Sequence, residues 1–208
     1  MVLETLNIPY EFAETTFANI KEPAYLAVNP NGRLPAIHDP NTDLTLWESG
    51  AIIEYLVETY DQENKLSFPR GSKEAFLAKQ WLFFQVSGQG PYYGQAIWFQ
   101  KYHPERIESA VTRYLDEVRR VTGVLESHLA KQKEAGGGGE EGPWLVGNRF
   151  SYADLAFVPW QVLFMEAAPE GRIDFEGFPV VRDWMRRLGE KEGIRKVLEV
   201  GLMPKQSA

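Results

Sequence analysis

Residues 29–60, NPNGRLPAIHDPNTDLTLWESGAIIEYLVETY, decide the fold of this chain. Their order predicts a turn, a short apolar strand, a second turn, a returning strand and a helix. The Asn-Pro-Asn-Gly run at 29–32 marks the first turn, and residues 39–43 supply the second. Beyond residue 48 the apolar residues recur at helical spacing. The stretch therefore predicts a β-hairpin that leads directly into an amphipathic helix.

The entrance to this hairpin presents backbone groups to its surroundings. Pro35 stands at the first position of the first strand, so the backbone groups of Leu34 are expected to face outward. An X-Pro bond favours trans over cis by only about 0.5–1 kcal/mol, so this bond is a candidate for the cis form. In that form the N–H and C=O of Leu34 would turn toward the backbone of a ligand.

Glu48 and Ser49 place a carboxylate and a hydroxyl at the start of the predicted helix. Serine is a preferred N-cap, and the free N–H groups behind it, together with the helix dipole, favour a bound carboxylate. Glu48 would hold an ammonium group, so the pair could bind the two charged ends of an amino acid. The alternative is that Ser49 only caps the helix and that Glu48 is only solvated.

These features together resemble the glutathione site in the thioredoxin-like domain of soluble glutathione transferases. In that family the residue before the cis-proline bonds the cysteinyl part of glutathione, and a Glu/Gln-Ser pair binds its γ-glutamyl end. The resemblance implies that Leu34, Glu48 and Ser49 bind glutathione. It also implies a role for Lys21, because relatives often carry a basic residue near glutathione. The alternative for Lys21 is a solvated surface lysine.

Later stretches, at residues 81–95, 113–126 and 144–160, are similar to a fungal branch of this family that includes a nitrogen-catabolite regulator of yeast. The resemblance covers nearly the whole chain. It implies an α/β thioredoxin-like N-terminal domain over residues 1–66 and an all-α C-terminal domain over residues 73–203. The polar, proline- and glycine-containing residues 61–72 read as the linker between them.

The first residues depart from the family pattern. Residues 2–6 have helical spacing, whereas the family begins with a strand and carries its thiol-activating Ser, Tyr or Asn just after it. The resemblance thus implies a domain that lacks its first strand, a chain truncated at its N-terminus and a catalytic residue upstream of Met1. Residues 10–14 alternate as a strand. Alternatively, this strand pairs directly with the strand after Pro35, in a non-catalytic protein.

The amino-acid composition restricts the classes of partner and site that this protein can have. The 208 residues are 44% hydrophobic and 25% charged, with no cysteine and a net charge of −7. The missing cysteines exclude disulfides, thiolate metal sites and a cysteine nucleophile, and suit a reducing compartment. The negative charge argues against nucleic acid and anionic membranes. No apolar run approaches the roughly 20 residues of a membrane span, and the three histidines show no metal-binding spacing.

The second half is helical. An aromatic-rich helix over residues 73–86 should break at the Ser-Gly-Gln-Gly-Pro run and resume at residue 92. The hydroxyls of Tyr92 and Tyr93 either face an apolar acceptor pocket beside the first domain or belong to the core. Residues 133–142 are low in complexity, without the lysine of a phosphate-binding loop. Ser151 and Asp154 form a variant capping box, which makes Asp154 a folding residue rather than a catalytic acid.

The expected function is that of a glutathione transferase, which conjugates glutathione to hydrophobic electrophiles or reduces peroxides with it. Glutathione would be the co-substrate, without a metal, and its thiolate would be the nucleophile. The resemblance further implies a cytoplasmic homodimer that acts in detoxification. The alternative is a non-catalytic glutathione-binding or regulatory protein that acts through protein contacts.

Overall fold

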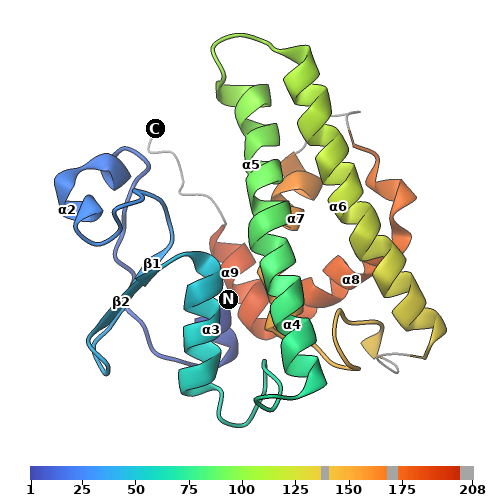
Figure 1. The fold of residues 1–208 in the computed structure, drawn as a ribbon, viewed down its shortest axis with the longest axis horizontal. Coiled ribbons are helices and arrows are strands. Elements are labelled where there is room, and N and C mark those ends of the chain that lie inside the picture. Colours follow the sequence, from blue (N-terminus) through green and yellow to red (C-terminus); the bar gives the residue numbers. More distant parts are fainter. Residues whose placement is uncertain (137–140, 168–172, 202–208) are drawn as a thin grey trace.

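The computed structural model describes residues 1–136, 141–167 and 173–201 of the chain (Figure 1). Its elements in chain order are α1 (Val2–Thr5), η1 (Asn19–Lys21), α2 (Pro23–Leu26), β1 (Ala36–Asp39), β2 (Leu44–Trp47), α3 (Ser49–Tyr60), α4 (Lys73–Phe84), η2 (Gln85–Gln89), α5 (Gly90–Ile97), η3 (Trp98–Tyr102), α6 (Glu108–Glu134), α7 (Tyr152–Ala167), η5 (Phe175–Gly177), α8 (Pro179–Glu190) and α9 (Glu192–Val200). None of the helices described is long and apolar enough to cross a membrane.

The predicted hairpin and its helix are confirmed. Strands β1 and β2 pair antiparallel, with Ala36 opposite Trp47 and Asp39 opposite Leu44. Helix α3 follows β2 after a single residue, Glu48. Figure 1 shows the hairpin to one side of the molecule, with α3 between it and the column formed by α4 and α5.

The strand predicted over residues 10–14 is wrong. Residues 9–16 have no regular secondary structure, and the side chains of Tyr10 and Phe12 are 50% and 81% exposed. A strand persists only where a neighbouring strand accepts its backbone hydrogen bonds. Within the described ranges the sheet consists of β1 and β2. The alternating segment therefore has no strand beside it to stabilise it, and the alternative in which it pairs with the strand after Pro35 is also wrong.

The break expected at residues 87–91 is also wrong, because the helix runs without interruption from α4 to η3. The segments η2 and η3 are π-helical turns within this run. A π turn shifts each hydrogen bond by one residue, and this widening accommodates Pro91, which lacks an N–H. Figure 1 shows α4 and α5 as one long column with α6 returning beside it.

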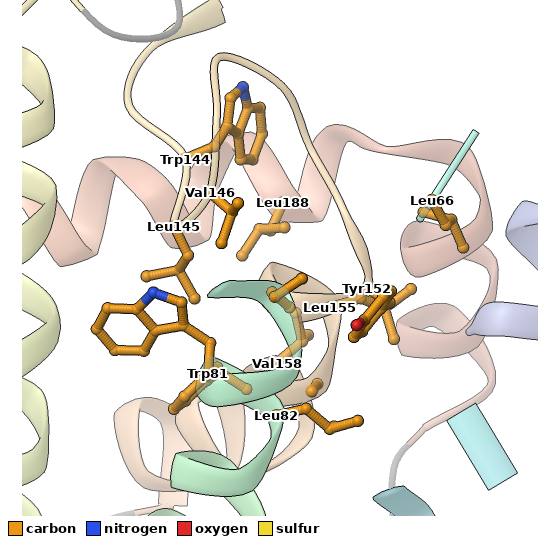
Figure 2. Packing of buried hydrophobic residues seen from close by; sticks show 14 of the residues in the cluster. Leu66, Trp81, Leu82, Trp144, Leu145, Val146, Tyr152, Leu155, Val158 and Leu188 are labelled. Carbon is orange, nitrogen blue, oxygen red and sulfur yellow. The ribbon is translucent and has the colours of Figure 1, made fainter. Parts of the chain in front are cut away.

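The segment between α3 and α4 is held against the rest of the protein by hydrogen bonds and by a buried leucine. Asp61 accepts hydrogen bonds from the backbone N–H groups of Leu66 and Ser67 at 2.9 and 2.7 Å. Leu66 is 1% exposed, and its carbonyl accepts a hydrogen bond from Tyr152 N at 2.8 Å. Figure 2 shows Leu66 and Tyr152 among the buried side chains of the main core. The end of α3 is thereby tied to the start of α7.

A second contact joins the first and last helices that the structure describes. Helix α1 packs against α9, and Figure 1 shows the N-terminus beside α9. Gly193 permits this approach: a Cβ at that position would lie 2.5 Å from Thr5 Oγ1 and 2.7 Å from Thr5 N. The domain boundaries at 1–66 and 73–203 stay a prediction. Residues 137–140 of the low-complexity stretch and residues 202–203 of the helical domain lie outside the described residues.

Candidate functional site

The open end of the hairpin brings together three of the predicted site residues. Because Ala36 pairs with Trp47, residues 34–35 and 48–49 lie at the same end of the two strands. The peptide bond between Leu34 and Pro35 is cis, as predicted. Leu34 is 44% exposed, and its backbone forms no hydrogen bond with any described residue. Its N–H and C=O are therefore free to bond a ligand.

Glu48 occupies an unusual backbone conformation at this end. Its φ is 73° and its ψ 115°, outside the favoured regions for a residue with a side chain. Such conformations cost about 1–3 kcal/mol and concentrate at functional sites. At Glu48 this conformation lets the chain pass from the end of β2 to the start of α3 across a single residue.

The prediction that Ser49 caps α3 is wrong. The N-cap is Glu48, without a side-chain capping bond, and Ser49 is already the first residue of the helix. Its hydroxyl consequently lies within the first turn and has no hydrogen-bond partner in the described part of the chain. The first intrahelical bond runs from Ile52 N to Glu48 O at 3.0 Å, so the N–H groups of residues 49–51 are left over. A half-buried hydroxyl and these N–H groups together can bind a carboxylate.

Lys21, far away in sequence, reaches this site through a residue that sequence reasoning treated only as part of a turn. Its ammonium donates to the carbonyl of Asn31 at 3.3 Å. The side-chain amide of Asn31 donates in turn to Glu48 Oε1 at 3.4 Å. Gly32 permits the approach, because its φ is 59° and a Cβ there would lie 2.9 Å from Lys21 Nζ. Asn31 thus links two residues that are predicted to bind the ligand. The sequence signal for this role is weak: Asn31 lies within residues 29–60, which decide the fold.

A tyrosine pair holds the hairpin against α3. The carboxylate of Asp39 accepts hydrogen bonds from the hydroxyls of Tyr55, at 2.6 Å, and Tyr60. These bonds lower the pKa of Asp39 to about 2. Asp39 ends β1, whereas both tyrosines project from α3. The clamp therefore fixes the helix relative to the strands whose opposite end carries the site.

The two tyrosines suggested for an acceptor pocket have different environments. Tyr93 is fully buried, and its hydroxyl bonds Thr122 Oγ1 at 2.9 Å and Gln161 Oε1 at 3.1 Å. Burial raises its pKa. Tyr93 is thus a core residue, so the pocket suggestion is wrong for it. Tyr92 is half-buried, with its ring 6.4 Å from that of Tyr114. Among the described residues no group of His, Cys, Asp or Glu is arranged to hold a metal ion.

Two family domains match the chain. Residues 1–64 match the glutathione S-transferase N-terminal domain, and residues 108–187 match the glutathione S-transferase C-terminal domain. The glutathione S-transferase-like protein gedE of Aspergillus terreus is 56% identical over 205 residues, which are 98% of this chain and 90% of that protein.

Solved structures similar to this chain belong to the same family. The glutathione transferase URE2P6 from Phanerochaete chrysosporium, in complex with oxidized glutathione, has a TM-score of 0.87 and 46% identity, covering 96% of this chain and 88% of that one. Ure2p in complex with glutathione has a TM-score of 0.85 and 38% identity, covering 94% and 89%. The hairpin with α3 and the helices after it thus form the predicted thioredoxin-like and all-α architecture. The chain belongs to the glutathione S-transferase family, among its fungal and Ure2-like members.

Proposed function

We propose that this protein is a glutathione transferase that binds glutathione at the open end of the hairpin. The observation that carries the proposal is the meeting of unused backbone groups, a carboxylate, a hydroxyl and an ammonium at one place. Leu34 contributes the backbone groups, and Glu48 and Ser49 stand beside them at the start of α3. Lys21 is joined to them through Asn31.

Glutathione has a complementary pattern of charges. Its γ-glutamyl ammonium would bind Glu48, and the neighbouring carboxylate would bind Ser49 and the free N–H groups of α3. The cysteinyl N–H and C=O would pair with Leu34. The second carboxylate, on the glycyl end, is left for Lys21. Two of the similar structures contain oxidized glutathione or glutathione, which supports the same ligand here.

The proposed chemistry uses the thiolate of bound glutathione, because the thiolate rather than the thiol is the nucleophile. With a chlorinated aromatic electrophile, the sulfur bonds the ring carbon and chloride leaves. With an organic hydroperoxide, the thiolate takes the terminal oxygen, an alcohol leaves, and a second glutathione converts the sulfenic acid to disulfide and water. The residues proposed here bind and orient glutathione, and none of them is assigned the proton of the thiol.

The remaining expectations are proposals that follow from this activity. A transferase for hydrophobic electrophiles and peroxides acts in detoxification, and a chain without cysteine suits the reducing cytoplasm. A homodimer is proposed because large aromatic side chains stay uncovered on α4: Phe76 is 67% exposed and Phe83 is 61% exposed. Exposed apolar surface of this kind marks sites of association.

Turnover assays test the proposal. Purified protein with glutathione should convert 1-chloro-2,4-dinitrobenzene or cumene hydroperoxide, and calorimetry should detect glutathione binding. Binding without turnover of either substrate would favour a non-catalytic glutathione-binding protein. Absence of both binding and turnover would refute the proposed function.

A further inference from the structure

Two opposite charges at the proposed site contact the same residue without forming an ion pair with each other. Lys21 and Glu48 are both exposed, and each contacts Asn31. Neither forms an ion pair with any described residue. A direct pair between them would occupy the ammonium and the carboxylate that a charged ligand needs. Asn31 contacts both residues and therefore lies where it can keep the lysine away from the glutamate.

Asn31 stands between the two charges and uses different atoms for each. Its backbone carbonyl oxygen accepts from Lys21 Nζ, and its side-chain amide donates to Glu48 Oε1. Acceptor and donor thus match the positive and the negative partner. Neither the backbone carbonyl nor the side-chain amide carries a charge, so both charges remain available to a ligand.

The position of Asn31 is itself held by its own turn. Its backbone N–H donates to Asn29 Oδ1 at 2.9 Å, and Asn29 is 2% exposed. The amide of Asn29 donates to the carbonyl of Arg33 at 2.6 Å, which closes the turn on its other side. Gly32 leaves room for Lys21 Nζ beside the turn, because a Cβ there would lie 2.9 Å from it. The spacer is anchored by a buried side chain rather than by the charges that it separates.

We propose that Asn31 is a positioning residue that separates Lys21 from Glu48, so that both stay available to the charged ends of glutathione. This inference rests on the proposed glutathione site and goes beyond it by assigning a role to a residue that holds two of its ligands apart. Without the side-chain amide, Glu48 loses its neutral partner, and the Lys21 ammonium leaves the backbone carbonyl of residue 31 to form an ion pair with it. Glutathione then has to break that pair in order to bind.

The chain offers a matched control in Asn41. Residues 39–41 repeat the pattern of residues 29–31, an Asx-Pro-Asn turn, and Asn41 N donates to Asp39 Oδ1 at 2.9 Å. The side chain of Asn41 donates instead to Tyr60 OH at 3.1 Å, away from Lys21 and Glu48. Asn31→Ala and Asn41→Ala therefore delete the same group from the same kind of turn. The separation of charges is lost in the first variant alone.

Glutathione affinity measured by calorimetry should fall about fivefold in Asn31→Ala, the most that competition from an exposed ion pair costs, and should stay within about twofold of wild type in Asn41→Ala. Because salt screens an exposed ion pair, the deficit of Asn31→Ala relative to wild type should shrink to about threefold when salt rises from about 0.05 to 0.5 M. A deficit that came only from a loosened turn would not depend on salt in this way.

A double-variant cycle separates the mechanism from simple loss of a contact. With Lys21→Met in place there is no cation to collapse onto Glu48, so adding Asn31→Ala should cost no more than about twofold in affinity. A further readout needs no glutathione. In a crystal structure of ligand-free Asn31→Ala, Lys21 Nζ should lie within ion-pair distance of the Glu48 carboxylate.

Unchanged affinity in Asn31→Ala, additive effects in the cycle, or a lysine that stays away from Glu48 in the variant would overturn the inference. Failure of the proposed function is distinguishable, because wild-type protein would then bind no glutathione. In that case the Lys21–Glu48 distance in the ligand-free variant still decides whether Asn31 separates the two charges.

Discussion

Ser49 and Ser72 both stand where a helix begins, yet their hydroxyls have different partners. Ser72 is the N-cap of α4 and accepts a hydrogen bond from Ala75 N at 3.1 Å. Ser49 lies one residue inside α3 and caps nothing. Serine thus caps the helix at residue 72, whereas at residue 49 its hydroxyl is available to a ligand.

The substitution Ser49→Ala should weaken glutathione binding by about 1.5–3 kcal/mol, the usual loss for a hydrogen bond to a charged group. It should leave the free energy of unfolding nearly unchanged, because no capping bond is lost. Ser72→Ala is the control: it should lower the free energy of unfolding by about 1 kcal/mol and leave binding intact. Calorimetry and urea unfolding measure the two effects. Equal glutathione affinity in wild type and Ser49→Ala would show that the site is assigned wrongly.

Asp154 is a buried carboxylate that organises the start of α7. One oxygen accepts from Leu145 N at 2.9 Å and Trp184 Nε1 at 3.0 Å, and the other from Ser151 N at 3.0 Å. The predicted capping box is confirmed in this form, and it reaches beyond its own helix. Full burial outweighs these bonds and raises the pKa of Asp154 from 3.8 to about 6.

This raised pKa predicts how stability depends on pH. The folded protein binds the proton of Asp154 more tightly than the unfolded chain does, so the contribution is complete below about pH 4 and is lost as the pH rises through about 6. Two pKa units correspond to about 3 kcal/mol. Since Asp154→Asn cannot titrate, wild-type stability minus variant stability should fall by about that amount between pH 4 and pH 7. Urea unfolding across this range measures it, and parallel curves would contradict the prediction.

At the scale of elements, α1 packs against α9, the last helix that the structure describes. The contact depends on Gly193, since a side chain there would collide with the backbone of Thr5. The N-terminal helix is thereby attached to the last helix, and the hairpin domain is attached to the helical domain at a point far from the segment that connects them in sequence.

Gly193→Ala should therefore destabilise the protein by about 1–3 kcal/mol, as expected for overpacking against backbone atoms. Gly189 in α8 provides the opposite case, because a Cβ there meets no atom within 4 Å. Gly189→Ala should stabilise by about 0.5–1 kcal/mol through the better helix propensity of alanine. Thermal or urea unfolding of the two variants gives the comparison. A loss of stability in both, or in neither, would show that the α1–α9 contact is not as close as described.

At the scale of the whole molecule, α4 presents large aromatic side chains on its outer surface. Phe76 and Phe83 are seven residues apart, so they lie on one face of the helix. Single exposed apolar residues are common, but two phenylalanines exposed on one helix face favour association, although the exposed Gln80 separates them. A second copy of the chain is the occupant proposed for this face.

Light scattering at micromolar concentration should give twice the 23.7 kDa mass of one chain. Phe83→Glu should halve this mass, because a charge in an apolar interface is costly to bury. Phe12→Glu is a control with the same change of side chain, since Phe12 is 81% exposed but lies outside α4. A wild-type protein with the mass of one chain would refute the dimer.

Local chemistry was sufficient to predict the parts of the fold whose determinants lie within a few residues. Turn residues, Pro35 and the alternating apolar pattern specify the hairpin and the start of α3, and the Ser151–Asp154 spacing specifies the start of α7. Leu34, Glu48 and Ser49 follow from the same local features together with the family resemblance, whereas Lys21 follows from the resemblance alone. Their binding of glutathione stays a prediction.

Tertiary structure alone decided the features that depend on partners distant in sequence. The alternation at residues 10–14 forms no strand because no described strand lies beside it. Tyr93 is buried because Thr122 and Gln161 satisfy its hydroxyl. Lys21 and Glu48 are 27 positions apart, and the contact that links them is Asn31, which bonds both. Turn patterns do not predict that these two residues lie near each other. Such contacts arise from packing and hydrogen bonding between segments, which periodicity and local propensity do not encode.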